Sequence, residues 1–217
     1  MKRIAYIITL ASFVGCVLIQ CDSEDGFPAA AFPRLATRPV TEIGPNGAVF
    51  HAKTVQAGTD EVINRGFVWG TQEDINTLTS DKIEIGAGPA DFDTNVSAAL
   101  TAGTTYYVKA FAATKNVISY GTSVQFVAAG SMAPEVKGFT PASAKYMETV
   151  KVRGKRFSYV ETNNTVKFGD LDAIVIESTD STILCMVPRL TATPKVRISV
   201  NVANGVGQSV DYFELKP

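Results

Sequence analysis

The chain has 217 residues, with 20 lysines and arginines against 21 aspartates and glutamates, one histidine and three cysteines. This length suits two small domains, and the near-neutral charge argues against nucleic acid, whose binding needs a clustered positive surface. One histidine and so few cysteines leave almost nothing from which to build a zinc site, a Ser-His-Asp arrangement or a disulfide framework. We therefore expect no metal, no cofactor, and domains held together by their apolar cores.

Residues 1–20 have the build of an export signal. Lys2 and Arg3 form a short basic start, and sixteen residues without a charge, 4–19, follow and end two positions before Cys21. A membrane-spanning helix usually needs about 20 apolar residues, and this shorter run is interrupted by polar side chains. A cleaved secretory signal is therefore favoured over a retained span.

The end of the signal resembles the lipobox of bacterial lipoproteins, whose cysteine becomes the acylated first residue of the mature chain. In the segment 18–21, Gln20 departs from the small residue that this pattern prefers, and Cys16 is a competing position. Cleavage before Cys16 would leave an apolar stretch at the start of a polar segment, so we favour lipidation of Cys21. The alternative is a signal cut to release a soluble protein.

Acidic residues follow this cysteine directly, namely Asp22, Glu24 and Asp25. They resemble the export tag of surface lipoproteins in glycan-utilisation systems, although in other Gram-negative lineages an aspartate after the cysteine resembles an inner-membrane retention signal. The first resemblance implies an outer-membrane, lipid-anchored protein exposed at the cell surface. More than one acyl chain makes such attachment stable without a spanning helix, and residues 21–34 are expected to be a flexible acidic tether.

From Leu35 onward the chain consists of short alternating runs rich in Val, Ile, Thr, Tyr and Phe, separated by Gly, Asn, Asp and Pro. No helical period persists for a dozen residues, which predicts an all-β fold of immunoglobulin-like sandwiches. The strands expected in the first half are 48–55, 64–70, 82–85, 91–100, 105–113 and 122–128.

Leu100 is followed six residues later by Tyr106. This spacing resembles fibronectin type III domains, in which the hydroxyl of a corner tyrosine bonds back to the backbone, and it implies such a module over residues 35–129. If Tyr106 points inward, the two-residue period of a strand turns Tyr107, Lys109 and Phe111 to the opposite face. The same period turns three further residues inward: Val108, Ala110 and Ala112.

Residues 130–133 interrupt the alternation of apolar and polar residues, which predicts a short linker. Such a linker keeps the two domains in contact or restricts their relative orientation. The motifs after it are Phe139-Thr-Pro141, Gly154-Lys-Arg-Phe157, Asn164-Thr-Val-Lys-Phe-Gly169 and Val187-Pro188. Together they resemble the IPT/TIG domain, an immunoglobulin-like sandwich, over residues 134–217. The alternation of Val150 and Val152, and of Ile183, Cys185 and Val187, agrees with half-buried strands.

The polar residues offer little catalytic chemistry. His51 is expected on the solvent side of its strand, between inward Phe50 and Ala52, and Cys185 is expected in the core as a small hydrophobe. Two acidic pairs, at 91/93 and 170/172, are expected to be solvated turns or edges rather than a glycosidase pair across a cleft. The basic stretch 151–156 is expected to be a solvated strand face. We therefore expect no catalytic residues.

Surface aromatic residues are the feature that best indicates a binding function, because rigid amphipathic rings serve both as sugar-binding platforms and as hot spots of protein interfaces. The candidate binding aromatics are Tyr107, Phe111, Tyr120 and Tyr159, whereas Trp69 is expected to be core. We expect a non-enzymatic surface lipoprotein that binds a polysaccharide or a partner protein, as the resemblance to accessory lipoproteins of glycan-utilisation systems implies. The alternative is a spacer or adhesion scaffold without a small ligand.

Overall fold

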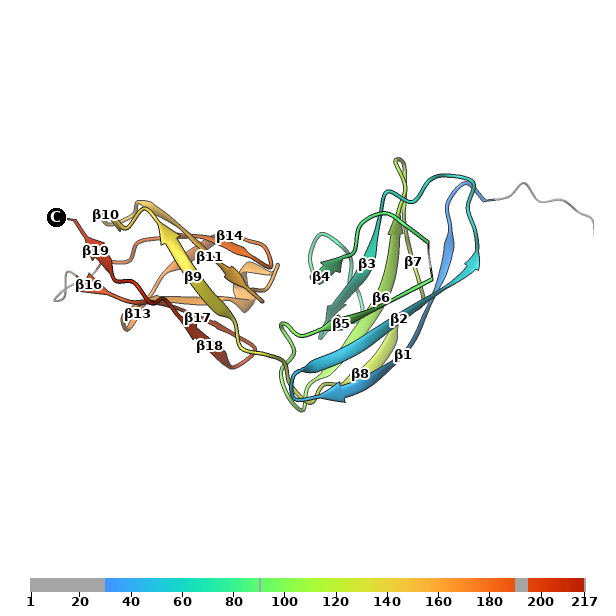
Figure 1. Ribbon diagram of the computed structural model, residues 1–217, viewed down its shortest axis with the longest axis horizontal. Helices are drawn as coiled ribbons and strands as arrows, with labels where there is room; N and C mark the ends of the chain where they lie inside the picture. The colour runs from blue at the N-terminus through green and yellow to red at the C-terminus, as the bar shows by residue number, and fades with distance from the viewer. Residues whose placement is uncertain (1–29, 90, 190–194, 217) are drawn as a thin grey trace, which may run out of the picture.

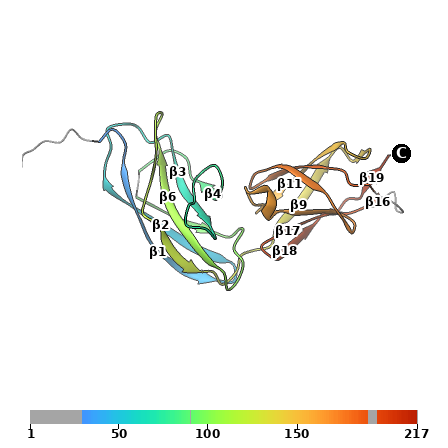
Figure 2. The ribbon, with the colours of Figure 1, turned by 180° about the vertical axis from the view of Figure 1, so that it is seen from behind.

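The structure, a computed structural model, describes residues 30–89, 91–189 and 195–216. These residues form nineteen strands and one short 3-10 helix, and they contain no α-helix, which confirms the all-β prediction. Two immunoglobulin-like sandwiches follow one another along the chain and lie end to end (Figures 1 and 2). In the described part of the chain, no helix is long and apolar enough to cross a membrane.

In the first sandwich, a sheet of order β1-β2-β5 faces a sheet of order β4-β3-β6-β7, in which β8 also pairs with β6. Its strands are β1 (Arg34–Gly44), β2 (Gly47–Gln56), β3 (Asn64–Gly70), β4 (Asp81–Glu84), β5 (Phe92–Val96), β6 (Thr105–Ala113), β7 (Ile118–Tyr120) and β8 (Val124–Val127). Strands β3 and β6 have the bounds that the sequence predicts. Strand β5 ends four residues earlier than expected, because Ala99 turns the chain with a φ of 52°.

The tyrosine corner is confirmed. The Tyr106 hydroxyl accepts a 3.0 Å hydrogen bond from the backbone N–H of Thr101, and the inward face of β6 is buried as the two-residue period predicts. Phe50 on the opposite sheet packs edge-on against Phe67, Trp69 and Phe126, with ring centroids 5.5–5.8 Å apart. Trp69 therefore belongs to the core, as expected.

In the second sandwich, a sheet of order β14-β15-β11-β9 faces a sheet of order β13-β12-β17-β18, and a smaller sheet β10-β19-β16 closes one end. The strands are β9 (Glu135–Thr140), β10 (Ser143–Ala144), β11 (Thr149–Lys155), β12 (Thr165–Phe168), β13 (Leu171–Asp172), β14 (Ile174–Ser178), β15 (Thr182–Met186), β16 (Lys195–Val196), β17 (Ile198–Val202), β18 (Gly205–Gln208) and β19 (Phe213–Leu215). The 3-10 helix η1 (Glu161–Asn163) precedes β12.

The core of the second sandwich is the one that the alternation predicts. Val150, Val152, Ile183 and Val187 are buried, and so is Cys185, whose thiol pKa rises to about 12 because burial disfavours the thiolate. Each of these side chains comes from β11, β15 or the residue that follows β15, so one face of this sheet is covered by the other sheet. The prediction that Cys185 is a core residue is confirmed.

The motif Gly154-Lys-Arg-Phe157 has a steric explanation. A Cβ at position 154 would collide with the backbone oxygen of Glu135 on β9 and with the ring of Phe157. Glycine therefore lets β9 and the ring approach the backbone of β11 together, and Phe157 is buried as a result.

The segments on either side of the first sandwich are bonded to it. The carbonyls of Ala30 and Ala31, at the end of the predicted tether, accept hydrogen bonds from Thr59 and Asp60, so this part of the segment 21–34 packs on the sandwich and is not free. In the linker 130–133, Ser131 Oγ bonds to the backbone of Leu100. The remainder of the tether, the signal 1–20 and both Cys16 and Cys21 lie outside the described residues.

Candidate functional site

A second, smaller apolar cluster lies on the outer face of β3 and β6. It contains Val68, Ile75 and Phe111, with Tyr107 and Tyr120 packed against it. Phe111 is only 2% exposed, so the prediction that it is a surface aromatic is wrong. Its side chain does point away from the main core, but the loop 71–80 folds back over this face, and Ile75 covers the ring.

Tyr120 fixes the loop 71–80 in this position. Its hydroxyl accepts a 3.0 Å hydrogen bond from the backbone N–H of Thr77 and lies 2.9 Å from the hydroxyl of the same residue. Tyr107 and Tyr120 are both half-buried. Instead of forming a binding platform, these two predicted aromatics support a loop that becomes one wall of the cavity described below.

Asp81, the first residue of β4, joins the two domains. Its Oδ1 accepts a 2.6 Å hydrogen bond from the Ser158 hydroxyl and a 2.9 Å bond from the backbone N–H of Tyr159, and its Oδ2 accepts a 3.3 Å bond from the side-chain amide of Asn163. Asp81 is 5% exposed. Burial raises the pKa of this carboxyl to about 6, while the three hydrogen bonds act in the opposite direction.

The donors to Asp81 lie on a loop that Asn164 holds in shape. The Asn164 side chain accepts a 2.9 Å hydrogen bond from the backbone N–H of Ser158 and donates bonds of 2.9 and 3.0 Å to the carbonyls of Ser158 and Val160. Asn164 is itself buried. The second domain thus presents a preorganised set of donors to Asp81, and ordering this loop costs little further conformational entropy when the domains dock.

Tyr159, the last predicted binding aromatic, is half-buried beside this contact. The Lys82 ammonium lies 4.9 Å from the centre of its ring, at a distance typical of a cation–π contact. Burial, with the nearby charges of Asp180 and Glu84, raises the pKa of the Tyr159 hydroxyl to about 12. Tyr159 therefore belongs to the domain contact and presents no exposed platform.

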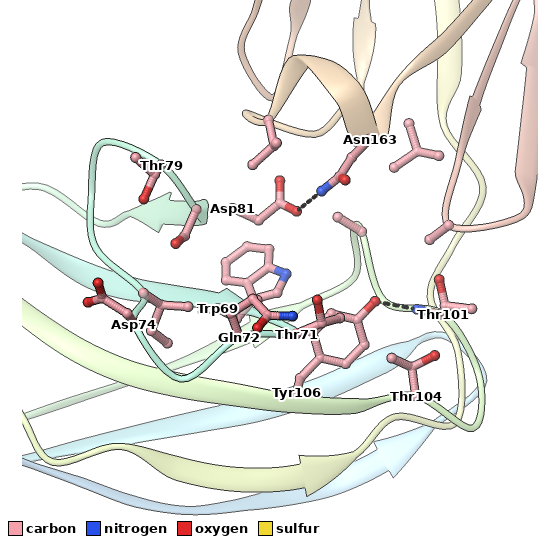
Figure 3. A pocket seen from close by; sticks show the side chains of 17 residues that line it. Trp69, Thr71, Gln72, Asp74, Thr79, Asp81, Thr101, Thr104, Tyr106 and Asn163 are labelled. Carbon is pink, nitrogen blue, oxygen red and sulfur yellow. Dashed lines mark hydrogen bonds between the residues drawn. The ribbon is translucent and has the colours of Figure 1, made fainter.

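A cavity of about 520 Å³ lies beside the Asp81 contact, between the two domains (Figure 3). This volume falls within the range of about 300–1,000 Å³ that is usual for small-ligand sites. The first domain supplies most of the lining, from the end of β3, the loop 71–80, the loop before β6 and Tyr106, and the second domain supplies the rest. The second-domain residues are Val160, Asn163, Val202 and Ala203.

The indole N–H of Trp69 lacks a hydrogen-bond acceptor among the described residues. Trp69 is 3% exposed, and its Nε1 is buried without a hydrogen-bond partner among the residues that the structure describes. Figure 3 shows the ring between Asp81 and Tyr106, with its nitrogen edge turned toward the space that the lining side chains enclose. A buried donor without an acceptor costs about 1–3 kcal/mol, so an acceptor that reached this N–H from the cavity, after a shift of the groups that cover it, would be favoured.

A hydrogen-bonded chain of hydroxyl, imidazole and carboxylate lies elsewhere, on β1, β2 and β5. Thr41 Oγ1 is 2.6 Å from His51 Nε2, and His51 Nδ1 is 2.7 Å from Asp93 Oδ1. The expectation that His51 lies on the solvent side of its strand, between inward Phe50 and Ala52, is confirmed, and the strand pairing brings two polar partners to it there. The Asp93 side chain is 64% exposed, whereas the aspartate of a serine-protease triad is buried.

The other polar candidates stay separate. Asp91 accepts a hydrogen bond from the backbone N–H of Thr54, which lowers its pKa, and Asp172 pairs with Lys167 at 3.3 Å. Among the described residues, no three His, Cys, Asp or Glu side chains gather in a way that could hold a metal ion. The cavity between the domains is the candidate site, because hydroxyl, amide and carboxylate side chains of both domains gather around it.

A sequence model of the IPT/TIG domain family matches residues 134–216. This part of the chain is an IPT/TIG domain. The match confirms the resemblance that the motifs between Phe139 and Pro188 indicate. No curated protein matches the chain in sequence. The fibronectin resemblance of residues 35–129 stays a prediction, although the tyrosine corner that it implies is present.

Several solved structures are similar to the chain. One is a protein of unknown function from Bacteroides thetaiotaomicron, with 26% identity over 39% of this chain and 22% of that one, and a TM-score of 0.38. Another is an auxiliary nutrient binding protein from Bacteroides ovatus, with 23% identity over 39% and 21% and a TM-score of 0.35. SGBP-B from a complex xyloglucan utilization locus in Bacteroides uniformis has 14% identity over 86% and 50%, with a TM-score of 0.35. The chain spans half or less of each of these proteins.

Proposed function

We propose that this chain is a non-enzymatic binding protein of the outer-membrane surface, and that it holds a polysaccharide segment in the cavity between its IPT/TIG domain and the preceding sandwich. The observation that carries the proposal is the cavity of about 520 Å³ between the domains, which Trp69 lines and whose other lining side chains carry hydroxyl and amide groups; the buried Nε1–H of Trp69 lacks an acceptor among the described residues. An oxygen atom of a bound ligand would supply the acceptor that this N–H group lacks.

The remaining lining groups suit a polyhydroxylated ligand. Hydroxyls come from Thr71, Thr101 and Thr104, and side-chain amides come from Gln72 and Asn163. Such groups both donate and accept hydrogen bonds, as sugar hydroxyls do. The Trp69 and Tyr106 rings border the cavity only with their edges, because these core side chains are 3% and 6% exposed, so the polar groups supply most of the ligand contact.

The predicted location of the protein agrees with the same proposal. The predicted lipidation of Cys21 would hold the domains at the membrane, and the acidic residues that follow it resemble a surface-export tag. At that surface, a cavity with many hydroxyl and amide groups would meet extracellular polysaccharides. The two sandwiches would then capture the polymer without cleaving it.

The substitution Trp69→Phe tests this function. It keeps an aromatic ring in the core and removes the N–H group, so it separates the hydrogen bond from the packing of the ring. Calorimetry or affinity electrophoresis of residues 22–217 against a panel of polysaccharides should show binding that weakens about tenfold in the variant, since one hydrogen bond contributes about 1 kcal/mol or more. A panel without any binding would contradict the proposal.

A role as a rigid spacer with a protein partner is the second candidate. It is favoured by the linker, which is bonded at both ends: Ser131 holds the Leu100 backbone of the first domain, and the Arg156 side chain donates a 2.6 Å hydrogen bond to the Ala133 carbonyl. A spacer requires a neighbour in fixed stoichiometry. Cross-linking in cells should then recover one partner protein, to the same extent from the wild-type protein and from Trp69→Phe.

A further inference from the structure

We infer that the cavity selects uncharged saccharides and discriminates against uronic acids and sulfated sugars; this inference rests on the proposed function. The residues that line the cavity include two carboxylates, Asp74 and Asp81, and no lysine, arginine or histidine. The hydroxyls of Thr71, Thr101 and Thr104, which also line the cavity, are neutral donors that can serve a hydroxyl or ring oxygen. An anionic sugar would find donors there, but no positive charge to balance its own.

Two basic side chains near the domain contact, those of Lys82 and Arg156, are occupied by other partners. Lys82 follows Asp81 on β4, and its ammonium lies 3.2 Å from Glu84 Oε1 and donates to the Thr77 carbonyl at 3.2 Å. Arg156 bonds to the carbonyl of Ala133 and lies 3.8 Å from a Glu135 carboxylate oxygen. Either side chain would have to give up these contacts, and neither lines the cavity.

The negative charge of the cavity is fixed in its wall. The Asp81 carboxylate is held by Ser158, Tyr159 and Asn163, so it cannot turn away from a bound anion without breaking the domain contact. Two like charges close together in a partly buried site repel each other strongly, because little water screens them. Discrimination by an unfavourable contact of this kind is a common source of specificity.

The structure also predicts how cationic sugars behave. Asp74 lines the cavity from the loop 71–80, and no salt bridge to it occurs in the described part of the chain. An amino sugar could pair its ammonium group with this carboxylate. We therefore expect amino-substituted saccharides to bind at least as well as their neutral counterparts, and acidic saccharides to bind at least tenfold more weakly.

The experiment uses the fluorescence of Trp69, which is the only tryptophan of the chain. Residues 22–217 are titrated with neutral polymers (glucan, mannan, xylan and galactan), with acidic polymers (polygalacturonate, alginate and chondroitin sulfate) and with chitosan. Polygalacturonate is also compared with its methyl-esterified form, which has the same backbone without the charge. The expected result is that one or more neutral polymers change the emission, and that each acidic polymer binds at least tenfold more weakly than the best of them.

The variant Asp74→Asn should reduce this discrimination several-fold by improving the binding of acidic polymers, whereas the matched control Asp172→Asn, whose carboxylate pairs with Lys167 away from the cavity, should leave it unchanged. An acidic polymer that binds more tightly than every neutral one would overturn the inference and leave the proposed function standing. If no polymer binds by calorimetry or by fluorescence, the proposed function fails and the inference fails with it.

Discussion

Ser158 of the IPT/TIG domain donates a 2.6 Å hydrogen bond to the buried carboxylate of Asp81 in the preceding sandwich. Asp81 and Asn163, which also bonds to it, both line the cavity. The same contact therefore orients the two domains and shapes the binding site. Because linkage is reciprocal, a ligand that bridges both domains should stabilise their docking, and a weaker contact should lower the affinity for that ligand.

The substitution Asp81→Ala should separate the domains and weaken binding. It leaves the Ser158 hydroxyl, the Tyr159 N–H and the Asn163 amide without their acceptor, and hydrogen bonds to a charged group contribute about 1.5–3 kcal/mol each. We expect small-angle scattering to show a broader distribution of interdomain distances, and calorimetry to show an affinity at least tenfold lower. Glu84→Gln, a neighbouring change on the same strand, is the control. A variant with unaltered scattering and affinity would show that this contact does not fix the orientation.

The stability of the first domain should depend on pH through Asp81. Its pKa is about 6 in the folded protein and 3.8 when the carboxyl is exposed, so the folded state binds more protons between these values. The contribution of Asp81 to the free energy of unfolding is therefore largest below about pH 4 and is lost as the pH rises through 6. This difference corresponds to on the order of 3 kcal/mol.

Denaturant unfolding followed by Trp69 fluorescence at pH 4, 5, 6 and 7 measures this effect. The wild-type protein should gain stability relative to Asp81→Asn as the pH falls. The charged and titratable groups closest to this contact include Lys82, Glu84, Tyr159 and Asp180, so Glu84→Gln and Asp180→Asn serve as controls that should keep the pH dependence. If the stability of the wild-type protein and of Asp81→Asn changed with pH in parallel, the buried carboxylate would not be the source of the pH dependence.

Tyr120→Phe should weaken ligand binding although Tyr120 does not line the cavity. The change removes the hydroxyl that bonds to Thr77 and keeps the ring in the outer apolar cluster, so it should cost about 1 kcal/mol and loosen the loop 71–80. Hydrogen exchange should increase in this loop, and the affinity should fall several-fold. Unchanged exchange in the loop would mean that the apolar contact of Ile75 is sufficient to hold it.

The Thr41–His51–Asp93 chain provides a test of the proposal that the protein is not an enzyme. Its carboxylate is exposed, unlike that of a catalytic triad. We expect the wild-type protein to hydrolyse p-nitrophenyl acetate no faster than His51→Ala, and no faster than His51→Ala supplied with free imidazole. A rate that drops on removal of either His51 or Thr41 would establish nucleophilic chemistry at this site.

Local sequence patterns predict the features that depend on local geometry. The two-residue period correctly assigns the inward face of β6, and the Leu100–Tyr106 spacing correctly predicts the bond from the Tyr106 hydroxyl to the backbone. The alternation in the second half likewise predicts the burial of Cys185. In each case the outcome depends on residues that are close in sequence, or on which side of a strand a residue lies.

Local patterns do not reveal what covers an outward face. Phe111 points outward as predicted, yet the loop 71–80 buries it, and the sequence does not show that Ile75 covers the ring while Leu78, the other apolar residue of this loop, stays exposed. Asp81 and Ser158 are 77 residues apart, so their contact depends on how two complete domains dock. His51 acquires its partners through the pairing of β2 with both β1 and β5. The cavity is formed by such contacts, and sequence analysis therefore missed it.

The indole N–H resonance of Trp69 gives the most direct test of the central claim. Because the chain has one tryptophan, a nitrogen–proton correlation spectrum contains a single indole cross-peak, and this peak reports on the donor that faces the cavity. Titration with a polysaccharide that binds by calorimetry should move this peak and slow its exchange with water, as expected when the N–H gains an acceptor. A polysaccharide that binds with clear heat and leaves the indole cross-peak in place would contradict the assignment of the binding site.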